Sequence, residues 1–101
     1  MRKPVACSLD ASSAHDQLDE WRSVLATAVV ESERIDEHTL EMRLRPDADV
    51  AAIISLAQRE IACCPFFGFA INLDADNVTF VATVPPDAAP ILDGFATLGH
   101  A

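Results

Sequence analysis

A change of hydrophobic period at Pro65 constrains the fold of this chain more than any other feature. Residues 48–64 place apolar side chains at helical spacing, whereas residues 67–73 alternate between large apolar and small or polar side chains. A residue that precedes proline is disfavoured in the helical conformation, so the helix is expected to end before Pro65. The same stretch carries the adjacent cysteines Cys63 and Cys64. The pattern predicts a helix that ends at two thiols and leads directly into a strand.

The order helix, strand, strand occurs twice in this sequence. The expected parts of one domain spanning 1–101 are an N-terminal arm (1–11), a first helix–strand–strand unit (13–45), a second such unit (48–84) and a C-terminal helix (87–98). A four-stranded antiparallel sheet with the helices on one face is the simplest way to bury both units. The sequence therefore predicts an α+β fold, with Asp47 or Asp49 capping the second helix.

The apolar side chains predict which faces are buried. The expected core residues are Ala14, Leu18, Trp21 and Leu25 in the first helix; Val50, Ile53, Ile54, Ala57 and Ile61 in the second; Phe67, Phe69, Ile71, Leu73, Val78, Phe80, Ala82 and Val84 in the second pair of strands; and Ala88, Ile91, Phe95 and Leu98 in the last helix.

The net charge of −9 excludes several classes of partner. A phosphate backbone or an anionic membrane surface would be repelled, so neither nucleic acid nor a membrane is expected as a partner. No apolar run approaches the roughly 18 residues that span a bilayer, and the N-terminus lacks the apolar region of a secretory signal. A cytoplasmic protein is expected, and a homodimer would bury more surface than so small a domain does alone.

The cysteines are the candidate site. A break in the backbone at Pro65 would let the neighbouring thiols of Cys63 and Cys64 turn toward one point, where Cys7 of the arm could supply a third sulfur. A disulfide between neighbours is disfavoured, because their α-carbons lie about 3.8 Å apart. Thiolates select soft ions, and three sulfurs suit Hg(II) or As(III) better than tetrahedral zinc. No catalytic residue or organic cofactor is predicted, and folding is not expected to require an ion.

A purely structural role for the cysteines competes with this interpretation. Cys64 lies three residues after Ile61, so it continues the expected buried stripe, and free cysteine is among the most buried residue types. Cys63 falls outside that stripe, on the side of Leu56, which makes Cys63 the stronger functional candidate.

The segment Glu60-x-x-Cys63-Cys64-Pro65-Phe66-Phe67 resembles one found in small bacterial proteins and appended to some mercury-type transcriptional regulators. The resemblance implies a thiol-based heavy-metal role, in which Cys63 and Cys64 match the adjacent pair and Cys7 the upstream cysteine. This chain has no helix-turn-helix before the motif, so the DNA-binding role does not carry over.

Three functions remain open from the sequence. The first is capture of a soft metal or metalloid ion through Cys63, Cys64 and Cys7, for sensing, trafficking or scavenging. The second is a thiol-dependent enzyme that cleaves a carbon–metal bond or reduces an oxidised thiol, with Glu60 or another acid as proton donor. The third is a dimeric interaction module whose cysteines only fill the core.

Overall fold

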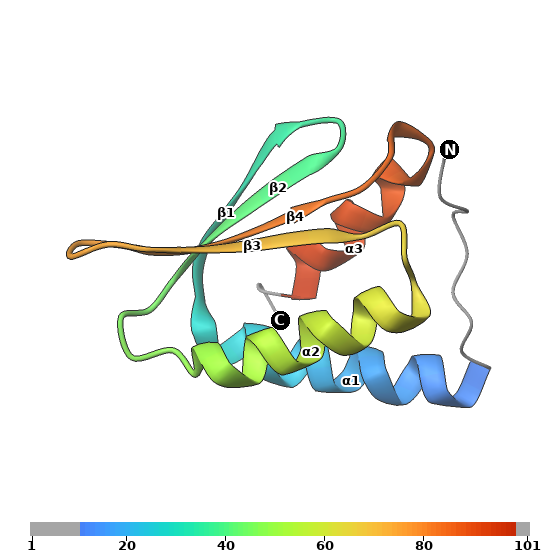
Figure 1. Cartoon of the computed structure of the whole chain (residues 1–101), viewed down its shortest axis with the longest axis horizontal. Helices are drawn as coiled ribbons and strands as arrows, with labels where there is room; N and C mark the ends of the chain where they lie inside the picture. The colour runs from blue at the N-terminus through green and yellow to red at the C-terminus, as the bar shows by residue number, and fades with distance from the viewer. Residues whose placement is uncertain (1–10, 99–101) are drawn as a thin grey trace.

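The computed structural model describes the backbone of residues 11–98 and the side chains of residues 16–96. Its elements follow the predicted order (Figure 1): α1 (Ala11–Ala28), β1 (Val29–Asp36), β2 (Thr39–Leu44), α2 (Val50–Cys63), β3 (Gly68–Leu73), β4 (Val78–Thr83), the 3-10 helix η1 (Pro86–Ala88) and α3 (Ala89–Leu98). The α+β prediction, with two helix–strand–strand units and a C-terminal helix, is confirmed.

The four strands form one antiparallel sheet in the order β1-β2-β4-β3. Each helix–strand–strand unit contributes one hairpin, and the hairpins join through β2 and β4, where Met42 lies opposite Phe80. Aspartates shape the two hairpin turns. Asp36 accepts a hydrogen bond from the His38 backbone, and Asp74 accepts from the Asp76 and Asn77 backbones.

The core lies between the helices and one face of this sheet (Figure 1). Alternate residues of the central strands point into it, and Leu40, Met42 and Phe80 are at most 1% exposed. The neighbouring positions on the other face, Glu41 and Arg43 among them, are partly or fully exposed. The helices therefore cover a single face, as the alternation in the sequence predicts.

The prediction of a buried side chain is wrong for five residues, which are 37–67% exposed: Leu18, Ile54, Ile61, Leu73 and Ile91. In α2 the buried residues are Ile53, Leu56, Ala57 and Cys63. The helix carries apolar side chains on more than half of its circumference, so its sequence is compatible with more than one buried face. Contact with α1 and the sheet selects the face that contains Leu56.

The ends of α2 are set by local chemistry. Asp49, not Asp47, caps the helix, and its carboxylate accepts a hydrogen bond from the Ala52 backbone at 3.1 Å. At the other end Cys64 leaves the helical conformation, with φ −129° and ψ 77°, as expected for a residue before proline. The predicted end of the helix at the cysteine pair is confirmed.

Candidate metal centre

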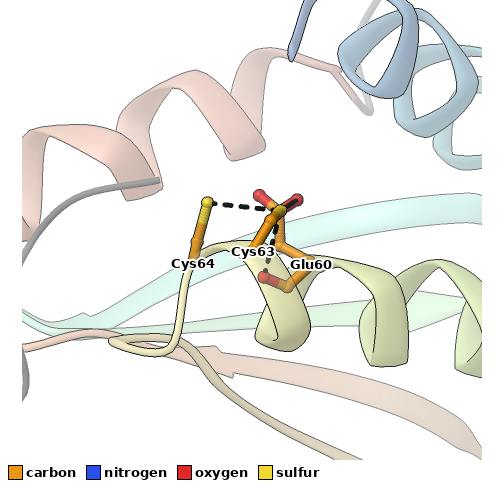
Figure 2. Close-up of side chains that lie close together, drawn as sticks. All are labelled: Glu60, Cys63 and Cys64. Carbon is orange, nitrogen blue, oxygen red and sulfur yellow. Dashed lines mark hydrogen bonds between the residues drawn. The ribbon is translucent and has the colours of Figure 1, made fainter. Parts of the chain in front are cut away.

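The last turn of α2 brings two sulfurs and a carboxylate together. Glu60 and Cys63 are three residues apart, so both project from the same side of the helix. Cys64 follows in the non-helical segment, and its backbone N–H still donates to the Glu60 carbonyl at 2.6 Å. The Cys63 and Cys64 sulfurs lie 3.6 Å apart (Figure 2). The prediction that the break at Pro65 turns neighbouring thiols toward one point is therefore met by this geometry.

Both cysteines are buried. Cys63 is 6% exposed and Cys64 is 1% exposed. Cys63 thus lies on the buried face of α2 and not outside it. The prediction that Cys63 falls outside the buried face is wrong, because it rested on a stripe through Ile61, which is 39% exposed. That Cys63 is the stronger functional candidate stays a prediction.

The surroundings of Cys63 are polar as well as apolar. Its sulfur lies 3.9 Å from a carboxylate oxygen of Glu60 and 3.5 Å from the Glu60 carbonyl. The side-chain amide of Gln17, on α1, donates to the same sulfur at 3.4 Å and also to the Glu60 carboxylate. A cysteine that only fills a core has no need of such partners.

Glu60 occupies a partly buried position that disfavours its charged form. Burial raises the pKa of the Glu60 carboxyl above its usual value, while hydrogen bonds from Gln17 and Cys63 and the nearby indole N–H of Trp21 lower the pKa and offset part of that rise. The indole nitrogen of Trp21 is fully buried and makes no hydrogen bond of normal geometry. Its effect on Glu60 is therefore that of a nearby N–H dipole and not of a formed hydrogen bond.

Glu60, Cys63 and Cys64 form a group that could hold a metal ion. Their sulfur and carboxylate ligand atoms all lie within 4.8 Å of one another. From the sequence, Glu60 was a candidate proton donor, and its place in this group was not predicted. The signal was present, because the three-residue spacing from Glu60 to Cys63 places both side chains on one helical face.

The two cysteines differ in oxidation state. Cys64 is disulfide-bonded, whereas Cys63 is a free thiol. A disulfide sulfur is not a thiolate, so Cys64 can act as a ligand only after reduction. Cys7 lies outside the described residues, so its part as a third ligand stays a prediction.

An exposed ion pair connects α1 and α2 close to this group. Arg59 binds the Glu20 carboxylate, with one nitrogen–oxygen distance of 3.3 Å. The hydrogen bond from Arg59 lowers the pKa of Glu20, and the same contact raises the pKa of Arg59. This ion pair joins the same two helices as the hydrogen bond from Gln17 to Glu60, but it involves neither sulfur.

Glutamine substitutions at Glu60 and Glu20 are expected to change the pH dependence of the free energy of unfolding in opposite directions. Because folding raises the pKa of Glu60, its contribution to stability is fully present below about pH 4.5, its unfolded value, and is lost as the pH rises through the folded pKa. Glu60→Gln should therefore gain stability relative to wild type as the pH increases. The lowered pKa of Glu20 makes its contribution present above its unfolded value and lost on acidification.

Urea unfolding at several values between pH 5 and pH 8, in one fixed oxidation state, measures both substitutions. Glu20→Gln should give an offset from wild type that stays constant across this range. A Glu60→Gln curve parallel to wild type would show that burial does not disfavour the Glu60 carboxylate.

Comparisons with known proteins place this chain in no group. No family model matches it, and neither a curated protein nor a solved structure is similar to it at a significant level. Within residues 11–98, no helix combines the length and the apolar character that crossing a membrane requires.

Proposed function

We propose that the reduced form of this protein captures a thiophilic metal or metalloid ion through Cys63, Cys64 and Glu60. The observation that carries the proposal is the convergence of two sulfurs and a carboxylate at the end of α2. The resemblance of the Glu60–Phe67 segment to heavy-metal proteins supports the same chemistry. Capture requires reduction of the disulfide that contains Cys64, because a thiolate and not a disulfide sulfur is the ligand.

The distance between the sulfurs favours a bent coordination. At the 3.6 Å separation found in the oxidised form, two sulfurs each about 2.3 Å from a shared ion would subtend an angle of roughly 100° at that ion. A linear ion would need a separation of about 4.6 Å at the same bond length. As(III), which forms a pyramid of three bonds, therefore suits the pair better than linear Hg(II), and Glu60 or Cys7 supplies the third bond.

The burial of the site also favours arsenite. Arsenous acid, As(OH)₃, arrives uncharged. Reaction with the two thiols and with a third protonated group, the Glu60 carboxyl or the Cys7 thiol, forms two As–S bonds and one further bond to that group. All three As–OH bonds break and three water molecules leave, each carrying a proton from a thiol or from the third group. No net charge is buried by this exchange, whereas a hydrated cation would first lose its water shell. The proposed roles are sensing, trafficking or scavenging of such an ion.

A core-only role for the cysteines is less well supported. That alternative expects apolar side chains around both sulfurs, whereas the Cys63 sulfur contacts the Gln17 amide and lies near the Glu60 carboxylate. Enclosure of the sulfurs alone does not distinguish the two roles, because soft-ion sites are often shielded from water.

One observation favours an enzyme as the second candidate. A carboxyl group with a raised pKa lies 3.9 Å from the Cys63 sulfur, so its protonated form could donate to a carbon atom of an organometal held by the thiolates. The carbon–metal bond would break, the hydrocarbon would leave with the proton, and the Glu60 carboxylate would take the vacated position on the metal. Turnover of an organomercurial, and not stoichiometric binding, would identify this activity.

Anaerobic titration of the reduced full chain with arsenite tests the leading proposal. One ion per chain is expected by calorimetry, with sulfur-to-arsenic charge-transfer absorbance that saturates at the same ratio. Zinc, which normally takes four ligands, should bind more weakly than arsenite. Absence of both heat and absorbance change with arsenite and with Hg(II) would refute capture of a soft ion.

A further inference from the structure

Gln17 forms hydrogen bonds to two of the proposed ligand groups from outside α2. Its side-chain nitrogen donates to the Glu60 carboxylate and to the Cys63 sulfur, the latter at 3.4 Å. An amide nitrogen carries two hydrogens, so one is available for each acceptor. Gln17 comes from α1, 43 residues before Glu60, and thus fixes two ligands of α2 from a separate helix.

We propose that Gln17 is a positioning residue that holds the Glu60 carboxylate in place as the oxygen ligand of the captured ion. This inference rests on the proposed function and names what determines its selectivity. A glutamate side chain has several rotatable bonds. A hydrogen bond that holds this side chain in one rotamer before the ion arrives removes part of the entropy cost of binding. Outer partners of metal ligands act in this way in many sites.

Trp21 supports this role for α1 independently. It lies four residues after Gln17 and therefore on the same face of α1. Its indole nitrogen is buried and has no hydrogen-bond partner among the described residues, so its N–H is free to donate. One face of α1 thus carries the Gln17 amide, which donates to Glu60, and a buried indole N–H that has no partner in the described part of the chain.

If Gln17 positions Glu60, the affinities for arsenite and for Hg(II) should depend differently on Gln17. Arsenite needs a third bond, so its affinity depends on a correctly placed oxygen of Glu60. Hg(II) is satisfied by two sulfurs, so its affinity should depend little on Glu60 or on Gln17. A merely structural contribution of Gln17 to the packing of α1 on α2 would weaken both ions equally.

Gln17→Met tests the inference, because methionine has a similar length and no N–H donor. Arsenite should bind the reduced Gln17→Met chain roughly 10–100-fold more weakly than wild type, the usual effect of losing an outer partner. The affinity for Hg(II) should change by less than about 3-fold. Glu20→Gln is the matched control, since it breaks an exposed contact between the same helices and should leave both affinities within about 3-fold of wild type.

The possible outcomes separate the inference from the function. If wild type binds neither ion, the proposed function itself is wrong. If wild type binds arsenite and Gln17→Met binds it equally well, or loses both ions to the same extent, Gln17 does not position Glu60. Should Gln17→Met fail to fold, Gln17→Glu replaces the donor by an acceptor at the same length and is expected to weaken arsenite binding at least as much.

Discussion

The reduced protein is expected to bind one arsenite per chain, and the oxidised protein is expected to bind arsenite far more weakly. In the oxidised form the Cys64 sulfur belongs to a disulfide, so Cys63 is the one free thiol among the described residues. Loss of a sulfur ligand should weaken binding by roughly 100-fold or more, beyond the 10–100-fold that loss of an outer partner costs. Calorimetry before and after anaerobic reduction, with thiols counted by mass spectrometry, measures the difference.

Serine variants give this experiment its controls. Cys63→Ser and Cys64→Ser should each abolish tight binding in the reduced state, and neither should recover it with added reductant. Cys7→Ser distinguishes the two candidates for the third bond: a loss of affinity would assign it to Cys7, whereas a loss confined to Glu60→Gln would assign it to the carboxylate. Equal affinity in the oxidised and reduced wild type would contradict a role for Cys64 as a ligand.

The parts of the fold that depend on neighbours in sequence were predictable. Pro65 restricts Cys64 directly, so the end of α2 and the change to strand β3 could be read from the chain. Turn residues such as Asp74 act over two or three positions, and the alternation on either side of them fixes which strand faces are buried. These local constraints were enough to give the number, the order and the pairing class of the elements.

The parts that depend on distant neighbours were not predictable. Ile54 and Ile61 form an apolar stripe as convincing as that of Leu56 and Cys63, and only the position of α1 and the sheet decides between them. The contact from Gln17 to Glu60 joins residues 43 apart through side chains that are common on helix surfaces. Nothing in either local pattern marks them as partners. The carboxylate of the candidate site was therefore missed, while its sulfurs were found.

Trp21 was predicted to lie in the core, and the structure buries it. Substitution of Trp21 is expected to have the largest effect on stability. Trp21 is 1% exposed and contacts three phenylalanine rings, with centroids 5.1 Å from Phe95, 5.8 Å from Phe69 and 5.9 Å from Phe80. It thus joins α1 to β3, β4 and α3 in one aromatic cluster. Such rings contribute by their buried area and by the geometry of their contacts.

Trp21→Ala is therefore expected to lower the free energy of unfolding by about 3–5 kcal/mol, the usual cost of removing a large buried aromatic side chain. Domains of this size have only about 5–15 kcal/mol in total, so this loss is a large fraction of the stability of the protein. Urea unfolding followed by circular dichroism measures the loss, since the substitution removes the single tryptophan of the chain.

Leu73→Ala is the control, because Leu73 was predicted to be buried and is 67% exposed at the end of edge strand β3. A change within about 0.5 kcal/mol is expected for a side chain that mostly contacts solvent. A cost at Leu73 comparable to that at Trp21 would mean that another surface covers this edge in solution. Dependence of that cost on protein concentration would then identify the covering surface as a second copy of the chain, since dissociation links stability to concentration.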